Sequence, residues 1–118
     1  MDKTTIGRDG EQAAVQFLER KGFRIIQTNY RVAGAEVDII AATNDILCFI
    51  EVKTRKSDAC GLPEDFVHRT KQRKIIRAAK FFSTRKAYQK YWVRFDVISI
   101  IRDGHGMTFD HLENAFEE

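Results

Sequence analysis

The sequence predicts a single α/β domain in which a mixed β-sheet is flanked by helices, with the element order α-β-β-β-α-β-β. Three observations support this prediction. A length of 118 residues fits one domain. Two segments repeat apolar residues at helical spacing, and five are rich in β-forming residues and separated by turn residues. Because there is no internal repeat and a single proline, we expect residues 1–118 to form one unit.

The first half of the chain reads as one helix followed by three strands. The helix is expected from about Thr5 to Lys21, where Ala14, Val15 and Leu18 recur at helical spacing and Gly22 follows as a helix-ending residue. Thr4, Thr5 or Asp9 can cap it. The expected strands are Phe23–Val32, Glu36–Ala42 and Ile46–Arg55.

The second half begins with a loop and a long basic helix. The loop is expected at Lys56–Pro63, the helix from Glu64 to about Arg85, and further strands at Trp92–Ile101 and Met107–His111. Asp103-Gly104-His105-Gly106 is a turn signal between these two strands. The apolar residues of the fourth strand are expected in the core: Trp92, Phe95, Val97 and Ile98.

Composition excludes several classes of protein. The balance of 43% hydrophobic and 31% charged residues argues against disorder, and no apolar run approaches the ~20 residues of a membrane helix. The first residues lead into no apolar signal segment, so we expect a cytoplasmic protein with no membrane partner. Cys48 and Cys60 lack the spacing of a zinc or disulfide framework, and Cys48 reads as a core thiol. His68, His105 and His111 are expected at the surface.

Positive charge is concentrated in one part of the chain. The net charge is +3, yet Phe66 to Phe95 holds ten basic residues and no acidic one. Within the expected helix, four basic residues lie within about 80° of one another, at Arg69, Arg73, Arg77 and Lys80. Gln72, Ile75, Ala79 and Phe82 lie on the opposite side. The pattern predicts a stripe that binds phosphates, with an ordinary solvated face as the alternative.

The short break at Asn44-Asp45 predicts the register of the second and third strands. A two-residue hairpin loop pairs Thr43 with Ile46, which places Asp38 opposite Glu51 and Glu36 opposite Lys53. One face of this hairpin is wholly apolar, with Val37, Ile39, Ala41, Ile46, Cys48, Ile50 and Val52. The other face begins apolar and ends in the four charged residues.

Two facing carboxylates indicate a cation site. Carboxylates ~5 Å apart require a proton or a cation between them, and paired carboxylates suit Mg²⁺ or Mn²⁺. Lys53 lies on the same face as Glu51 and can orient water or offset charge in phosphodiester hydrolysis. Glu11 lies on the inward face of the first helix, where a carboxylate needs a partner. The alternatives are surface salt bridges of Lys53 with Glu36 and Asp38, and a Glu11 stabilised by the helix dipole.

These residues resemble a known nuclease signature. Asp38 followed by Glu51-Val52-Lys53 resembles the PD-(D/E)xK superfamily, and the whole chain resembles the YraN-like family of uncharacterised bacterial proteins, similar to Holliday junction resolvases. The motifs that carry the likeness are Gly10-Glu11, Asn29-Tyr30-Arg31, Glu36 to Ala41, Phe49 to Arg55, Thr70-Lys71-Gln72 and Arg94 to Ile98. Val37 stands where the superfamily name has proline, and Ala35 stands where the family has glycine.

The resemblance implies a restriction-endonuclease-like fold and roles for four residues. Asp38 and Glu51 would hold the metal, Glu11 would join them, and Lys53 would be the catalytic lysine. The expected function is a Mg²⁺-dependent endonuclease on structured or branched DNA. The alternatives are a nucleic-acid-binding protein without cleavage and a structural or protein-interaction role.

Several further residues have expected roles beside these four. Arg55, Lys71 and the inward Gln72 are further expected nucleic-acid contacts outside the stripe. Asp96 reads as a buried structural carboxylate paired with Arg94, with a place beside the site as the alternative. The residues leave open whether the protein acts alone or as a homodimer.

Overall fold

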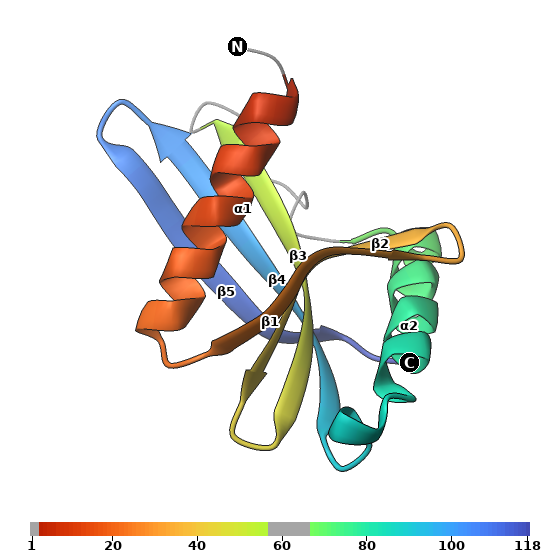
Figure 1. Cartoon of the computed structure of the whole chain (residues 1–118). Helices are drawn as coiled ribbons and strands as arrows, with labels where there is room; N and C mark the ends of the chain where they lie inside the picture. The colour runs from red at the N-terminus through yellow and green to blue at the C-terminus, as the bar shows by residue number, and fades with distance from the viewer. Residues whose placement is uncertain (1–2, 57–66) are drawn as a thin grey trace.

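The structure, a computed structural model, describes residues 3–56 and 67–118, and within α1 it describes side chains from Asp9 onward (Figure 1). Its elements are α1 (Lys3–Arg20), β1 (Arg24–Val32), β2 (Ala35–Thr43), β3 (Ile46–Lys56), α2 (Arg69–Ser83), the short 3₁₀ helix η1 (Lys86–Tyr88), β4 (Trp92–Asp103) and β5 (Gly106–Phe116). The predicted fold class and element order are confirmed. The expected loop after Lys56 lies outside the described residues.

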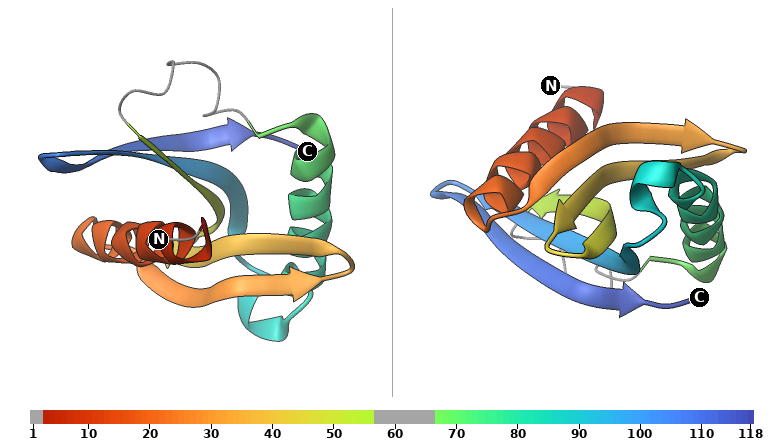
Figure 2. Two further views of the ribbon diagram at one scale, coloured as in Figure 1. Left: turned by 90° about the horizontal axis from the view of Figure 1, so that it is seen from above. Right: turned by 60° about the horizontal axis from the view of Figure 1, so that its bottom comes forward.

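The five strands form one mixed sheet in the order β1-β2-β3-β4-β5. Neighbours are antiparallel except β3 and β4, which are parallel and are connected through α2. The two helices cover opposite faces, as Figures 1 and 2 show. Ala14 and Leu18 of α1 pack in one apolar cluster with Ile39 and Ile50, whereas Phe82 of α2 belongs to the other. The sheet is therefore buried on both faces, as its apolar strands require.

The strands β2 and β3 part halfway along their length. They pair in the predicted register from Thr43 and Ile46 to Ile39 and Ile50. Beyond that point β2 stays with β1 as far as the pair of Val32 and Ala35, and β3 stays with β4 as far as Lys56 and Arg102. The expected cross-strand pairs of Asp38 with Glu51 and of Glu36 with Lys53 are therefore absent from the ladder. The carboxylates lie at the opening instead.

The alternation of side chains between the two faces of the sheet is interrupted at Asp38 in β2. Val37 was expected on the same face as Ile39, but Val37 packs in the cluster on the α2 side of the sheet and Ile39 in the cluster on the α1 side. This expectation was wrong because β2 turns where it leaves β3. On the neighbouring strand Asn29 falls between the pairs Thr28–Ile39 and Tyr30–Val37, and its φ of 53° interrupts the regular pleat.

The helix α2 begins later than expected. Residues 64–66 lie outside the described part, and Val67 and His68 are not helical. Val67 is buried, and Gln72 Nε2 donates a hydrogen bond of 2.7 Å to its carbonyl oxygen. These contacts hold the chain extended before Arg69. The buried face of Ile75, Ala79 and Phe82 is as predicted.

Two expectations about β4 and β5 were wrong. Trp92 is 73% exposed because it lies at the start of β4, opposite Ile46, outside both apolar clusters. The last strand reaches Phe116 rather than His111 because Asp96 on β4 binds it, accepting from the Asn114 N–H at 3.0 Å.

His68 and His105 are exposed as expected, and Cys48 is buried. Among the described residues, no helix has the length and apolarity that crossing a membrane requires.

The helix α1 packs tightly against β3 at Gly10. A Cβ atom built on Gly10 would lie 2.2 Å from Thr54 Oγ1, so a larger residue cannot fit without movement. The next residue, Glu11, is thereby carried close to the opening between β2 and β3.

Gly10→Ala should lower the free energy of unfolding by about 1–3 kcal/mol because of overpacking. The same substitution inside an unobstructed helix stabilises by about 1 kcal/mol, so the sign is informative. Urea unfolding of Gly10→Ala, Thr54→Ala and the double variant measures the effect. Thr54→Ala should remove most of the penalty, and Gly104→Ala, which has open space around it, should change little. A stabilised Gly10→Ala would contradict the close approach.

Candidate functional site

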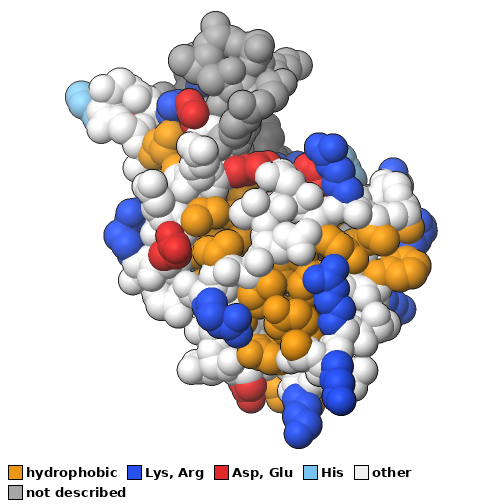
Figure 3. Space-filling view, in the orientation of Figure 1, with side chains coloured by type: hydrophobic (Ala, Val, Ile, Leu, Met, Phe, Trp, Pro, Cys, Tyr) orange, Lys and Arg blue, Asp and Glu red, His pale blue; other side chains and the backbone are white. Residues whose placement is uncertain are grey.

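Acidic side chains from α1, β2 and β3 meet where β2 and β3 part. Glu11, Glu36 and Asp38 each offer a carboxylate oxygen, and these oxygens lie within 4.8 Å of one another. Glu51 lies near enough for the charge of Asp38 to act on it. Figure 3 shows acidic side chains gathered beside Lys and Arg on the upper part of this face. The structure thus places Glu11, Glu36 and Asp38 side by side and Glu51 within electrostatic reach of Asp38.

Asp38 and Glu51 are nearly inaccessible to solvent. Asp38 is 9% exposed, and its Oδ2 accepts a hydrogen bond of 2.8 Å from the Val52 N–H. Glu51 is 4% exposed, and its Oε1 accepts a hydrogen bond of 2.5 Å from Lys71 Nζ. The second oxygen of Glu51 is buried without a hydrogen-bond partner. A buried oxygen in this state is costly.

Burial and mutual repulsion raise the pKa values of these carboxyl groups. Burial, followed by the charge of Asp38, raises the pKa of Glu11 to about 7 and that of Glu51 to about 7. Burial also raises the pKa of Asp38, although the Val52 N–H and the charge of Lys71 oppose the shift. The site therefore favours protons or a cation over free negative charge near neutral pH.

The lysines are arranged differently from the expectation. Lys53 is half-buried on β3, and its charge lowers the pKa of Glu51. Glu36 pairs with Arg31, with Arg31 Nε 2.6 Å from Oε2. Lys71 was predicted to contact nucleic acid. In the structure it forms an ion pair with Glu51 instead. Burial lowers the pKa of Lys71, but the hydrogen bond and charge of Glu51 outweigh burial and raise it.

Asn29 belongs to the site although the residue pattern gave it no role. It adopts a φ of 53°, and its side chain hydrogen-bonds the Glu11 carboxyl. This hydrogen bond lowers the pKa of Glu11, opposing the effect of burial. Asparagine tolerates positive φ better than most residues. An asparagine inside an expected strand could therefore have indicated an irregular backbone at this position.

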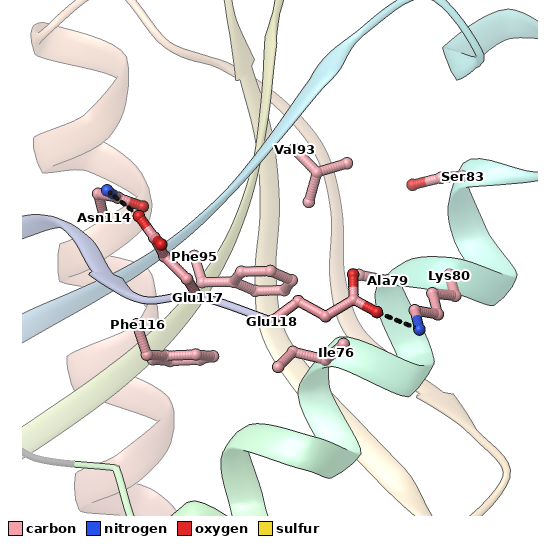
Figure 4. Close-up of a pocket in the computed structure, with 10 residues that line it drawn as sticks. All are labelled: Ile76, Ala79, Lys80, Ser83, Val93, Phe95, Asn114, Phe116, Glu117 and Glu118. Atoms are coloured by element: carbon pink, nitrogen blue, oxygen red, sulfur yellow. Dashed lines mark hydrogen bonds and ion pairs between the residues drawn. The ribbon is translucent and has the colours of Figure 1, made fainter.

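The helix α2 presents its cations to solvent. Arg69, Arg73, Arg77 and Lys80 are all exposed, on the side opposite the buried face. Lys80 forms an ion pair with Glu118 at the rim of a pocket of about 300 Å³ that includes Phe95 and Phe116 (Figure 4). Lys71, in the first turn of α2, reaches the carboxylates through Glu51. Arg55 is half-buried on β3.

The residues present fit a divalent cation. Every acidic group at the opening offers oxygen, which Mg²⁺ and Mn²⁺ prefer. One buried oxygen of Glu51 lacks a partner, and a metal ion would supply it. Asp38 would hold the ion with Glu11 and Glu36, whose carboxylate oxygens lie within 4.8 Å of its own, and Glu51 would join them through its unpartnered oxygen.

The buried carboxylate Asp96 has a structural role, as the sequence analysis favoured. Arg94 donates to both of its oxygens at 2.9 Å. His111, whose side chain is 3% exposed rather than at the surface as expected, lies 2.8 Å from Oδ2. Burial raises the pKa of Asp96, but its hydrogen bonds outweigh burial and lower it. These contacts fasten β5 to β4.

Comparison with known proteins identifies relatives along almost the whole chain. The model of "Uncharacterised protein family UPF0102" matches residues 10–100, which include every acidic residue of the site. A UPF0102 protein of Dictyoglomus thermophilum is 42% identical over 118 residues, covering 98% of this chain and 100% of the relative. A UPF0102 protein of Clostridium perfringens is 45% identical over 114 residues, covering 95% and 93%.

The metal-free protein should lose stability as pH rises from about 5 to 8. The folded pKa of Glu51 lies above its ordinary value of 4.5, at about 7, so its stabilising contribution is complete at low pH and disappears as pH passes the folded pKa. The loss is about 3 kcal/mol for Glu51, at roughly 1.4 kcal/mol per tenfold change in proton affinity. Urea unfolding in EDTA measures it.

Glu51→Gln is the matched control because it keeps the shape and cannot titrate, and its curve should be flatter. Saturating Mn²⁺ should restore stability at pH 8. Wild-type stability that stays constant or rises between pH 5 and 8 without metal would contradict this description of the site.

Proposed function

Because the chain belongs to the uncharacterised protein family UPF0102, we propose its function from the geometry of the site. The proposal is a Mg²⁺- or Mn²⁺-dependent endonuclease that hydrolyses phosphodiester bonds in structured or branched DNA. The observation that supports it most is the pair Asp38 and Glu51, both buried, with one Glu51 oxygen left without a partner. A protein that only needed a core would not retain such groups.

The arrangement supports particular roles for the residues. A metal ion, when bound, would polarise the phosphoryl oxygen and activate water. Asp38 and Glu51 would hold and orient that ion, and Glu11, hydrogen-bonded to Asn29, would bind a water beside it. Lys53 would offset the charge that develops on the phosphate. Exposed Arg69, Arg73 and Arg77 would bind the DNA backbone without reading bases.

The superfamily placement is part of the same proposal. The fold is compatible with the restriction-endonuclease-like class, and Asp38 with Glu51-Val52-Lys53 follows the order of the PD-(D/E)xK signature. The likeness to Holliday junction resolvases favours branched DNA as the substrate. A fold alone does not establish an activity, and the buried carboxylates Asp38 and Glu51 are what support nuclease chemistry.

A second function is a nucleic-acid-binding protein that does not cleave. The contact between Lys71 and Glu51 favours it, because a resident ammonium group neutralises part of the acidic site without a metal. The basic face of α2 serves either function.

Lys53→Ala should abolish most cleavage while keeping Mn²⁺ and DNA binding, since a group that stabilises the transition state affects rate more than affinity. Asp38→Asn should abolish both cleavage and the thermal stabilisation by Mn²⁺. Labelled duplex, flap and four-way junction DNA measure cleavage, and Lys74→Ala controls for loss of one positive charge. Wild-type protein that binds Mn²⁺ and junctions but cleaves none of the substrates would favour the non-catalytic alternative.

Arg73→Ala with Arg77→Ala should weaken binding to unrelated DNA sequences by a similar factor. Each phosphate contact removed should reduce the slope of log K against log salt by ~0.9, so two should reduce it by up to ~2. Fluorescence anisotropy at several salt concentrations measures the slope. Lys86→Ala with Lys90→Ala removes the same charge outside α2 and should leave the slope nearly unchanged. An unchanged slope in the α2 variant would place the DNA elsewhere.

A further inference from the structure

We propose that Lys71 is a tethered counter-ion, which occupies the cation position at Glu51 in the metal-free protein and has to leave Glu51 when a divalent ion binds. The inference rests on the proposed metal site and adds how access to that site is controlled. Lys71 was expected from the sequence to contact nucleic acid. In this proposal it acts before that, when the metal ion binds.

The two partners differ in their freedom to move. Glu51 is 4% exposed and lies within β3, paired with Val97 of β4, so its carboxylate is held in place. Lys71 lies in the first turn of α2, with a side chain that is 47% exposed. Its long, flexible side chain can withdraw its ammonium group into solvent without movement of the helix. When the contact breaks, Lys71 is therefore the group that leaves.

The ammonium group and a metal ion would use the same negative field. The charges of Glu51, Asp38 and Glu36 all act on Lys71, and Asp38 and Glu51 are the carboxylates that would hold the ion. Two cations that share one carboxylate in a partly buried site repel each other strongly. An arriving divalent ion therefore has to displace the ammonium group, and Lys71 lowers the affinity of the site for metal.

Lys71 provides a hydrogen bond to only one of the two carboxylate oxygens of Glu51. Lys71 contacts Oε1, and Oε2 stays buried without a hydrogen bond. A permanent structural ion pair normally satisfies both oxygens, as Arg94, His111 and the Asn114 N–H do around Asp96. The contrast indicates that Lys71 holds the place of another cation.

Calorimetric titration of Mn²⁺ without DNA at pH 8 tests the proposal. Lys71→Met removes the competing charge and keeps the apolar stem, so it should bind Mn²⁺ about tenfold more tightly than wild type. Lys71→Arg keeps a cation and should bind close to the wild-type affinity. Lys74→Met, which removes the same charge one turn along α2, should change the affinity by less than about twofold.

Thermal unfolding provides a readout independent of the binding isotherm. Without metal, Lys71→Met should melt at a lower temperature than wild type, because Glu51 loses its cation. Saturating Mn²⁺ should remove that difference. Circular dichroism before each titration verifies that the variant is folded.

The outcomes separate this inference from the metal site itself. Equal or weaker Mn²⁺ binding by Lys71→Met, with wild-type binding intact, would overturn the counter-ion role and leave the proposed metal site standing. Mn²⁺ binding by Lys71→Met, with no binding detectable in wild type, would give the strongest support for the counter-ion role of Lys71. No binding by any variant would reject the metal site and this inference together.

Discussion

The hydrogen bond from the Val52 N–H to Asp38 Oδ2 is the interaction on which the arrangement of the site depends. Where β2 leaves β3, the backbone of β3 loses its partner strand, and buried backbone donors require an acceptor. The Asp38 carboxylate supplies it and is fixed in position as a result. At this opening Glu11 of α1 lies beside Asp38, and Lys71 of α2 contacts Glu51.

Two buried aspartates in the same sheet differ in how their negative charge is balanced. Asp96 receives hydrogen bonds from Arg94, His111 and a backbone N–H, and its pKa is lowered. Asp38 receives one backbone hydrogen bond, and burial together with the charge of Glu36 raises its pKa. The first carboxylate is stable as an anion, whereas the second favours a proton or a cation. The two acidic groups of one sheet thus lie in opposite electrostatic environments.

Local patterns predicted more of the molecule than distant contacts did. The hairpin register from Thr43 to Ile39 was right because a two-residue turn determines it. Its extension to Asp38 failed because β2 and β3 part beyond Ile39 and Ile50, where β3 stays paired with β4 alone. Glu11, Asp38 and Glu51 could be found as candidates from chemistry and resemblance. The contact of Lys71 with Glu51 joins residues twenty positions apart across a crossover, which no periodicity encodes.

A crystal structure of the protein with Mn²⁺, with the ion located by its anomalous scattering, tests the central claim most directly. The account predicts an ion bound to carboxylate oxygens of Asp38 and Glu51, with Lys71 Nζ withdrawn from Glu51. At saturating Mn²⁺, an opening without an anomalous peak and with Lys71 still on Glu51 would contradict it. The acidic opening would then be a structural feature, and the function would have to be sought on another surface.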